Sequence, residues 1–121
     1  MKIERFEDVE SWKEARLLVK DVYRGLADCR DHGFTNQLQR AAISVMSNIA
    51  EGFNRGSNKE FIQFLIISRG SVAEVKSLLY AGFDIGYFNE PSLHKLLGRC
   101  NKITSLLDGF LRFLKGAARK R

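Results

Sequence analysis

Apolar residues recur at spacings of three and four in several separate segments of the chain. In the first segment, the apolar positions are Val9, Trp12, Ala15, Val19, Val22, Tyr23 and Leu26. In the second, they are Leu38, Ala41, Ala42, Val45, Ile49 and Gly52. This spacing places side chains on one face of an α-helix, and charged residues fill the other positions of the first segment. The pattern therefore predicts two amphipathic helices.

Two further segments repeat the pattern with a larger apolar content. The third contains Phe61, Phe64, Leu65, Ser68, Val72, Val75, Leu78 and Leu79. The fourth contains Leu93, Leu96, Leu97, Cys100, Ile103, Leu107, Phe110 and Leu114. Ile62, Ile66 and Ile67 widen the apolar arc of the third helix. Such a surplus indicates self-association through an exposed apolar surface, and broad burial within one monomer is the competing explanation.

Local signals mark the predicted helix boundaries. Residues 57–60 read Ser-Asn-Lys-Glu, a capping box directly before an apolar run. Thr35 or Asn36 is expected to cap the second helix. The first helix is expected to end near Cys29, because Gly33 shortly afterwards can supply a positive φ. Pro91 is compatible with the first turn of the fourth helix.

These elements predict an all-α fold of one domain. No segment alternates as a β-strand does, and the chain has a single proline. Helices of about 20–28 residues with short connections favour an antiparallel up-down-up-down four-helix bundle over residues 1–121, with a short basic tail at 117–121. Gly52 and Gly56 are expected to allow close approach and chain reversal at the corner between the second and third helices.

A polar cluster is predicted around this corner. Its members are Asn48, Glu51, Arg55, Arg69, Ser71 and Glu74. One interpretation is structural: hydrogen bonds and charge pairs that fix the helix register or a subunit contact. In the other interpretation, Arg55 and Arg69 contact phosphates.

The excess positive charge is confined to the last quarter of the chain. The net charge is +6. Residues 1–31 carry seven Lys or Arg and eight Asp or Glu, a net charge of −1, whereas residues 89–121 carry eight and two, a net charge of +6. The candidate phosphate contacts in this region are Arg99, Lys102, Arg112, Lys115, Arg119, Lys120 and Arg121. A basic end of this kind attracts polyanions such as RNA or DNA, although it is also compatible with a simply solvated helix end.

A third interpretation of the same end is binding to a membrane surface. Residues 106–121 combine an apolar side with Lys and Arg. We favour a role without a membrane, since the bundle requires that apolar face.

Other residues give little indication of catalysis. His32 and His94 lack companions at metal-ligand spacing, and no nucleophile with a positioned base is recognisable. We therefore expect no enzymatic activity and no metal or other cofactor. Cys29 and Cys100 are expected to be reduced residues of the core. A charged N-terminus and the lack of a long apolar window predict a cytoplasmic protein.

Three stretches of the chain resemble a known family. They are FEDVESWKEA at 6–15, RAAISVMSNIAEGFNR at 40–55 and SNKEFIQFLIISRGSVAEV at 57–75. They resemble the small four-helix bundle proteins encoded by intervening sequences of bacterial large-subunit rRNA genes, although that family commonly has proline where this chain has Met46.

The resemblance implies a function that composition does not show. It implies assembly as a ring-like homopentamer. It also implies kinship with the accessory variability determinant proteins of diversity-generating retroelements, which are basic, nucleic-acid-binding partners of a reverse transcriptase. The resulting hypothesis is a non-catalytic oligomeric scaffold that binds the backbone of RNA or DNA. The alternative is a structural or protein-interaction homo-oligomer with no nucleic-acid role.

Overall fold

The computed structural model describes residues 3–119, with side chains described through residue 117. A short 3₁₀ helix, η1 (Phe6–Asp8), precedes four α-helices: α1 (Glu10–Gly25), α2 (His32–Phe53), α3 (Asn58–Ile85) and α4 (Glu90–Arg119). No strand is present among these residues, and the all-α prediction is confirmed.

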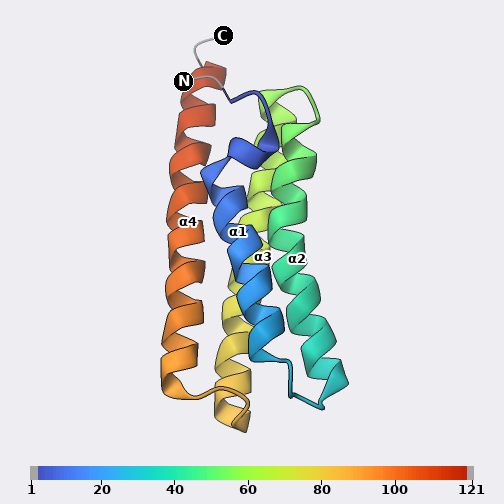
Figure 1. The fold of residues 1–121 in the computed structure, drawn as a ribbon. Helices are drawn as coiled ribbons and strands as arrows, with labels where there is room; N and C mark the ends of the chain where they lie inside the picture. Colours follow the sequence, from blue (N-terminus) through green and yellow to red (C-terminus); the bar gives the residue numbers. More distant parts are fainter. Residues whose placement is uncertain (1–2, 120–121) are drawn as a thin grey trace.

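The four helices lie side by side in an elongated bundle (Figure 1). α1 packs against α2 and α4, and α3 packs against the same two helices. Each helix therefore has two neighbours, and the shared core lies along the middle. The first and last described residues lie at the same end of the bundle (Figure 1).

The predicted apolar faces form this core. Leu38, Ile49, Leu65, Val72, Leu79, Ile103 and Leu107 are completely buried. Leu18 is also completely buried, although the predicted face of the first helix did not include it. Three predicted apolar positions are exposed: Ile67 is 52% exposed, Ile66 is 36% exposed, and Tyr23 on α1 is 43% exposed. Burial within one monomer therefore does not explain why the third helix has apolar residues at positions 66 and 67.

The third helix begins as the capping box predicts. The Ser57 hydroxyl accepts a hydrogen bond from the Glu60 backbone N–H at 3.2 Å and donates one to the Glu60 carboxylate at 3.1 Å. Asn89 similarly caps α4, with its side-chain oxygen accepting from Ser92 N–H at 2.9 Å.

The predicted start of the second helix is wrong. α2 begins at His32, and its cap is Asp31, whose Oδ1 accepts a hydrogen bond from Phe34 N–H at 3.1 Å. Gly33 lies inside α2 without a positive φ, and α1 ends at Gly25. Asp31 also accepts a hydrogen bond from the Tyr87 hydroxyl at 2.7 Å, which ties this cap to the chain beyond α3.

The corner between α2 and α3 confirms the two predicted glycine roles. Gly56 has a φ of +91°, a conformation that side chains other than glycine rarely adopt. Gly52 is buried, and a Cβ placed on it would lie 2.5 Å from the Cβ of Phe64. The two helices therefore approach each other closely at Gly52.

Candidate nucleic-acid interface

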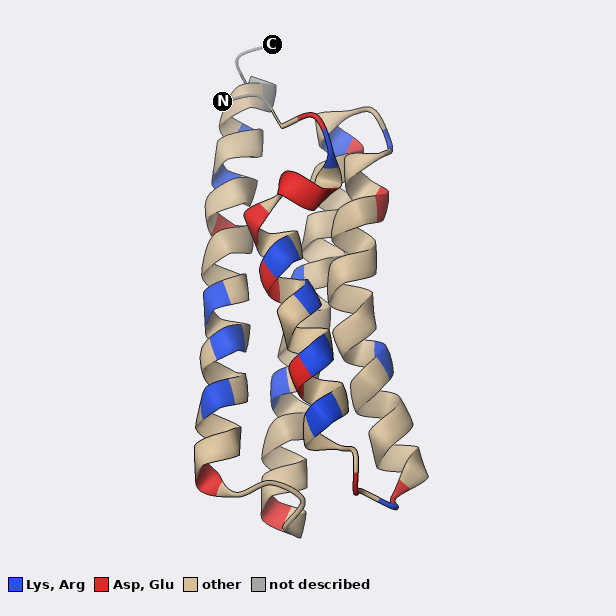
Figure 2. Cartoon of the chain, viewed as in Figure 1, with Lys and Arg blue, Asp and Glu red and all other residues tan. Residues whose placement is uncertain are grey.

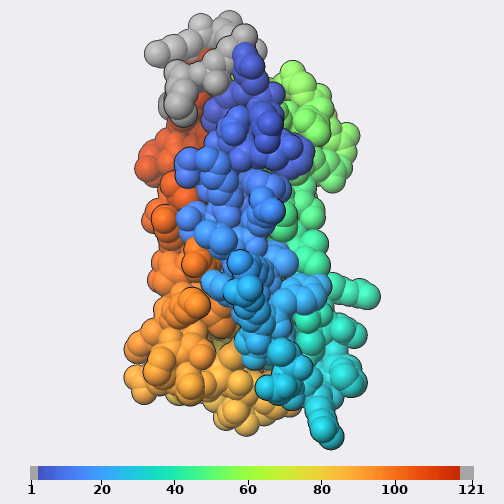
Figure 3. Space-filling model, in the orientation of Figure 1, coloured from blue at the N-terminus to red at the C-terminus, as the bar shows by residue number. Residues whose placement is uncertain are grey.

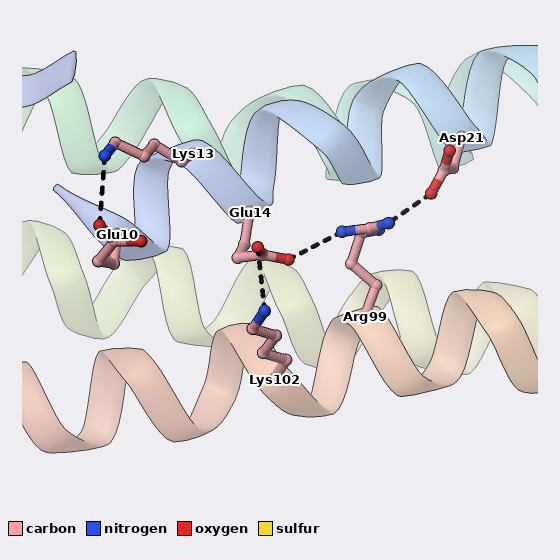
Figure 4. Close-up of polar contacts among 6 residues, drawn as sticks. All are labelled: Glu10, Lys13, Glu14, Asp21, Arg99 and Lys102. Atoms are coloured by element: carbon pink, nitrogen blue, oxygen red, sulfur yellow. Dashed lines mark hydrogen bonds and ion pairs between the residues drawn. The ribbon is translucent and has the colours of Figure 1, made fainter. Parts of the chain in front are cut away.

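A charged network joins α1 to α4 across their shared seam (Figure 4). Arg99 donates from Nε to Asp21 Oδ2 at 2.9 Å and from Nη1 to Glu14 Oε1 at 2.8 Å. Lys102 Nζ lies 3.2 Å from Glu14 Oε2. The Glu14 and Asp21 side chains are 13% and 14% exposed, so these carboxylates are shielded from solvent.

This network changes the interpretation of two predicted phosphate contacts. The guanidinium of Arg99 already has two carboxylate partners and is 24% exposed, so it primarily fixes α1 on α4. Lys102 shares one of these carboxylates but is 62% exposed, which leaves its ammonium accessible to a phosphate.

The outer surface of α1 carries further cations that were not among the predicted phosphate contacts. Lys13, Arg16, Lys20 and Arg24 follow one another at spacings of three or four residues and are all exposed. Lys13 pairs with Glu10 at 3.2 Å. Within the described part of the chain, the other three have no carboxylate partner. They are therefore free to interact with an external anion.

These cations continue onto α4. Arg24 and Lys95 line one depression of about 260 Å³, together with Asp21. Figure 2 shows Lys and Arg along α1 and along the adjacent part of α4, and the space-filling view shows the surfaces of the two helices adjoining (Figure 3). We call this surface the α1–α4 basic face, and its members are Lys13, Arg16, Lys20, Arg24, Lys95, Arg99 and Lys102.

The arrangement of side chains around α1 explains why the net charge of residues 1–31 did not indicate this face. Residues 1–31 sum to −1, yet Glu14 and Asp21 point into the seam while the cations lie outside. The spacing of Lys13, Arg16 and Lys20 was the available signal, since positions three or four apart share a helix face.

Two further predicted cations lie towards the C-terminal end of α4. Arg112 and Lys115 are exposed. Arg119, Lys120 and Arg121 fall outside the residues whose side chains are described.

The apolar side of the same segment serves the core. Leu107, Leu111 and Leu114 are at most 5% exposed, so they are not presented to a membrane surface. Phe113 on the same helix is 63% exposed.

The six residues of the predicted corner cluster divide into separate contacts. Asn48 Nδ2 donates to the Ser44 carbonyl at 2.8 Å and to its hydroxyl at 2.9 Å. The Ser44 hydroxyl in turn lies 2.8 Å from that of Ser71. This part-buried chain of hydrogen bonds links α2 to α3.

The charged members of that cluster separate from it. Arg55 pairs with Glu51 one turn earlier, at 2.8 Å, and its guanidinium lies 4.9 Å from the centroid of the Phe64 ring. Arg69 pairs with Asp108 of α4 at 2.9 Å. Glu74 is exposed and makes no ion pair within the described residues. Both arginines are therefore engaged within the chain.

The potentially reactive groups are few. Burial raises the pKa of the Cys100 thiol to about 12, so this thiol stays protonated at neutral pH. Across the described residues, no three His, Cys, Asp or Glu side chains are placed to share a metal ion. None of the described helices combines the length and apolar composition of a membrane span.

Comparisons with known proteins agree on the family and the fold. Residues 7–109 match the model of the 23S rRNA-intervening sequence protein family. A crystal structure of a protein of unknown function from the S23 ribosomal protein family of Bacteroides thetaiotaomicron superposes with a TM-score of 0.78 at 18% identity. That match covers 84% of this chain and 97% of the other. No curated protein matches the chain.

Proposed function

We propose that this chain, which belongs to the 23S rRNA-intervening sequence protein family, is a non-catalytic oligomeric scaffold that binds the phosphate backbone of RNA or DNA. The observation that supports the proposal is the α1–α4 basic face. Its cations line one side of the bundle (Figure 2). Glu14 and Asp21 of α1 are turned into the seam, whereas Glu10 is exposed and pairs with Lys13. Backbone phosphates are the matching ligand because they present regularly spaced negative charges without requiring base recognition.

Within this face, the contribution of each cation depends on its internal partners. Arg16, Lys20 and Arg24 have no carboxylate partner among the described residues, so phosphate binding does not require them to break an ion pair there. Lys95 extends the surface onto α4. Arg99 acts mainly by holding the two helices in register, since a phosphate would have to compete with Glu14 and Asp21.

A charge-matched pair of variants tests this assignment. The triple variant Arg16→Gln/Lys20→Gln/Arg24→Gln removes three exposed cations from the basic face. The control Arg30→Gln/Arg40→Gln/Lys59→Gln removes three exposed cations from elsewhere on the chain. At about 0.1 M salt, the first variant should bind duplex DNA and structured RNA more than about tenfold more weakly, because each released counterion contributes to affinity. If both variants lost the same affinity, the loss would reflect net charge alone, and this result would contradict binding at a localised basic face.

The contribution of the C-terminal tail is tested by truncation after Gly116. Binding that falls on truncation would place part of the contact in residues 117–121. Binding that survives would leave the contact on the bundle, as the proposal expects.

We also propose that the helices follow an up-down-up-down order and that the chain assembles as a homopentamer. The shared end of the described termini in Figure 1 supports the helix order. Support for self-association comes from α3, where Ile66, Ile67 and Tyr80 are 36%, 52% and 51% exposed. Five copies in a ring would multiply the basic face. Ile66→Lys/Ile67→Lys should shift sedimentation towards monomer, whereas Tyr23→Lys on α1 should not.

A second candidate function is a structural or protein-interaction oligomer, favoured by the same exposed apolar residues of α3. Partnership with a reverse transcriptase is part of the first candidate and rests on the resemblance to accessory variability determinant proteins. Co-purification with a reverse transcriptase encoded beside its gene would support it. Oligomerisation without any nucleic-acid binding at low salt would favour the second candidate.

A further inference from the structure

The part of α1 that follows η1 contains a shallow depression of about 570 Å³. Its lining combines basic residues with an aromatic ring: Arg5, Glu7, Trp12, Lys13, Arg16, Leu17 and Lys20. The depression shares Lys13, Arg16 and Lys20 with the α1–α4 basic face. It is therefore a concave extension of a surface already suited to phosphate.

The Trp12 side chain is held in position from two directions. The Phe6 ring packs edge-on against the indole, with ring centroids 5.2 Å apart and an interplanar angle of 68°. The Arg16 guanidinium lies over the indole, with its Cζ 5.7 Å from the ring centroid. This cation–π contact brings two planar groups together at the depression.

The charges around these planes favour an anionic ligand. Glu7, the acid in the lining, lies 3.7 Å from Arg5. Lys13 pairs with Glu10 at 3.2 Å. Arg16 and Lys20 have no carboxylate partner within the described chain. The depression thus offers planar groups for stacking beside uncompensated cations.

We infer that this depression binds an unpaired nucleotide of a single-stranded nucleic acid. The base stacks on the planar platform of Arg16 and Trp12, and the flanking phosphates contact Lys13 and Lys20. Bases in a duplex have their faces covered by neighbouring base pairs, so they cannot use such a platform, whereas unstacked bases commonly stack on aromatic rings or guanidinium planes. This inference rests on the proposed function and assigns to it a preferred ligand.

The chain contains a single tryptophan, so intrinsic fluorescence reports directly on the depression. The full chain is titrated with oligouridylate, oligothymidylate and a duplex DNA, and anisotropy of the labelled probe is followed in parallel. Single strands should change the Trp12 emission in proportion to binding, and the duplex should bind without that change. The two single strands distinguish RNA from DNA as the source of the nucleotide.

Variants separate stacking from charge. Arg16→Lys keeps the cation and removes the planar guanidinium, and should lower the ratio of single-strand to duplex affinity by about fivefold or more. Trp12→Leu should lower the same ratio. Arg40→Lys on α2 makes the matched exchange at another exposed site and should leave the ratio unchanged.

The outcomes distinguish this inference from the proposed function. Single-strand binding with unchanged Trp12 emission, or with an unchanged affinity ratio in Arg16→Lys, overturns the stacking site and leaves backbone binding in place. An equal emission change with duplex DNA also overturns it. Absence of binding by every probe at low salt removes the proposed function and the stacking site together.

Discussion

The close contact between α2 and α3 at Gly52 gives a quantitative stability prediction. In Gly52→Ala, the new Cβ would lie 2.5 Å from Phe64 Cβ and 3.0 Å from Phe61 Cδ1. Carbon atoms pack at about 3.5–4.0 Å, so the helices would have to separate by roughly 1 Å. Phe64 Cβ is attached to the backbone and cannot rotate away.

The expected size follows from two opposing effects. Overpacking of this kind destabilises a core by about 1–3 kcal/mol. The better helix propensity of alanine offsets at most about 1 kcal/mol. We therefore expect Gly52→Ala to lower the free energy of unfolding by about 1–2 kcal/mol.

Guanidinium denaturation at a fixed protein concentration measures this difference. Gly98→Ala is the control, because Gly98 is exposed in α4 and, among the described residues, no side chain or other helix comes within 4 Å of a Cβ placed there. The control should gain about 0.5–1 kcal/mol. A Gly52→Ala variant that unfolds at the same or a higher denaturant concentration than the parent would refute the close-approach argument.

Other predictions concern single contacts. Ser57→Ala removes the α3 cap and should lower the free energy of unfolding by about 1 kcal/mol, measured by denaturation. Tyr87→Phe removes the hydrogen bond that most lowers the pKa of Asp31, so NMR titration should find that pKa nearer its ordinary value of 3.8. The hydrogen bond from Tyr87 stabilises the fold only while Asp31 is ionised. The loss of unfolding free energy caused by Tyr87→Phe should therefore become smaller as the pH falls below 3.8. Cys100 should resist a thiol reagent in the native state, while the less buried Cys29 reacts first.

Much of the fold was predictable because helical periodicity and capping are local. The apolar faces of all four helices and the Ser57 cap follow from residues within a few positions of one another. The start of α2 does not. Asp-His-Gly resembles a helix end, but Asp31 is held by Tyr87, and Phe34 packs against Tyr87 and Phe88 with ring centroids 5.2 and 6.4 Å away. These distant aromatic contacts fix the first turn.

The candidate site was less predictable because it depends on how neighbouring helices are rotated. Arg69 reaches Asp108 on α4, and Arg99 reaches Glu14 and Asp21 on α1. Net charge by segment cannot show such pairings. Glu14 and Asp21 lie in the seam and do not offset the exposed cations of α1. These cations are therefore stronger candidates for phosphate contacts than Arg69 and Arg99.

The most direct test of the account is the salt dependence of duplex DNA binding by the parent chain and by Arg16→Gln/Lys20→Gln/Arg24→Gln. The slope of log affinity against log salt should become shallower by about 0.9 for each phosphate contact removed, which is roughly 2.7 for the three cations. The control Arg30→Gln/Arg40→Gln/Lys59→Gln should keep the parent slope. Equal slopes for the parent and the basic-face variant would contradict phosphate binding by the α1–α4 basic face.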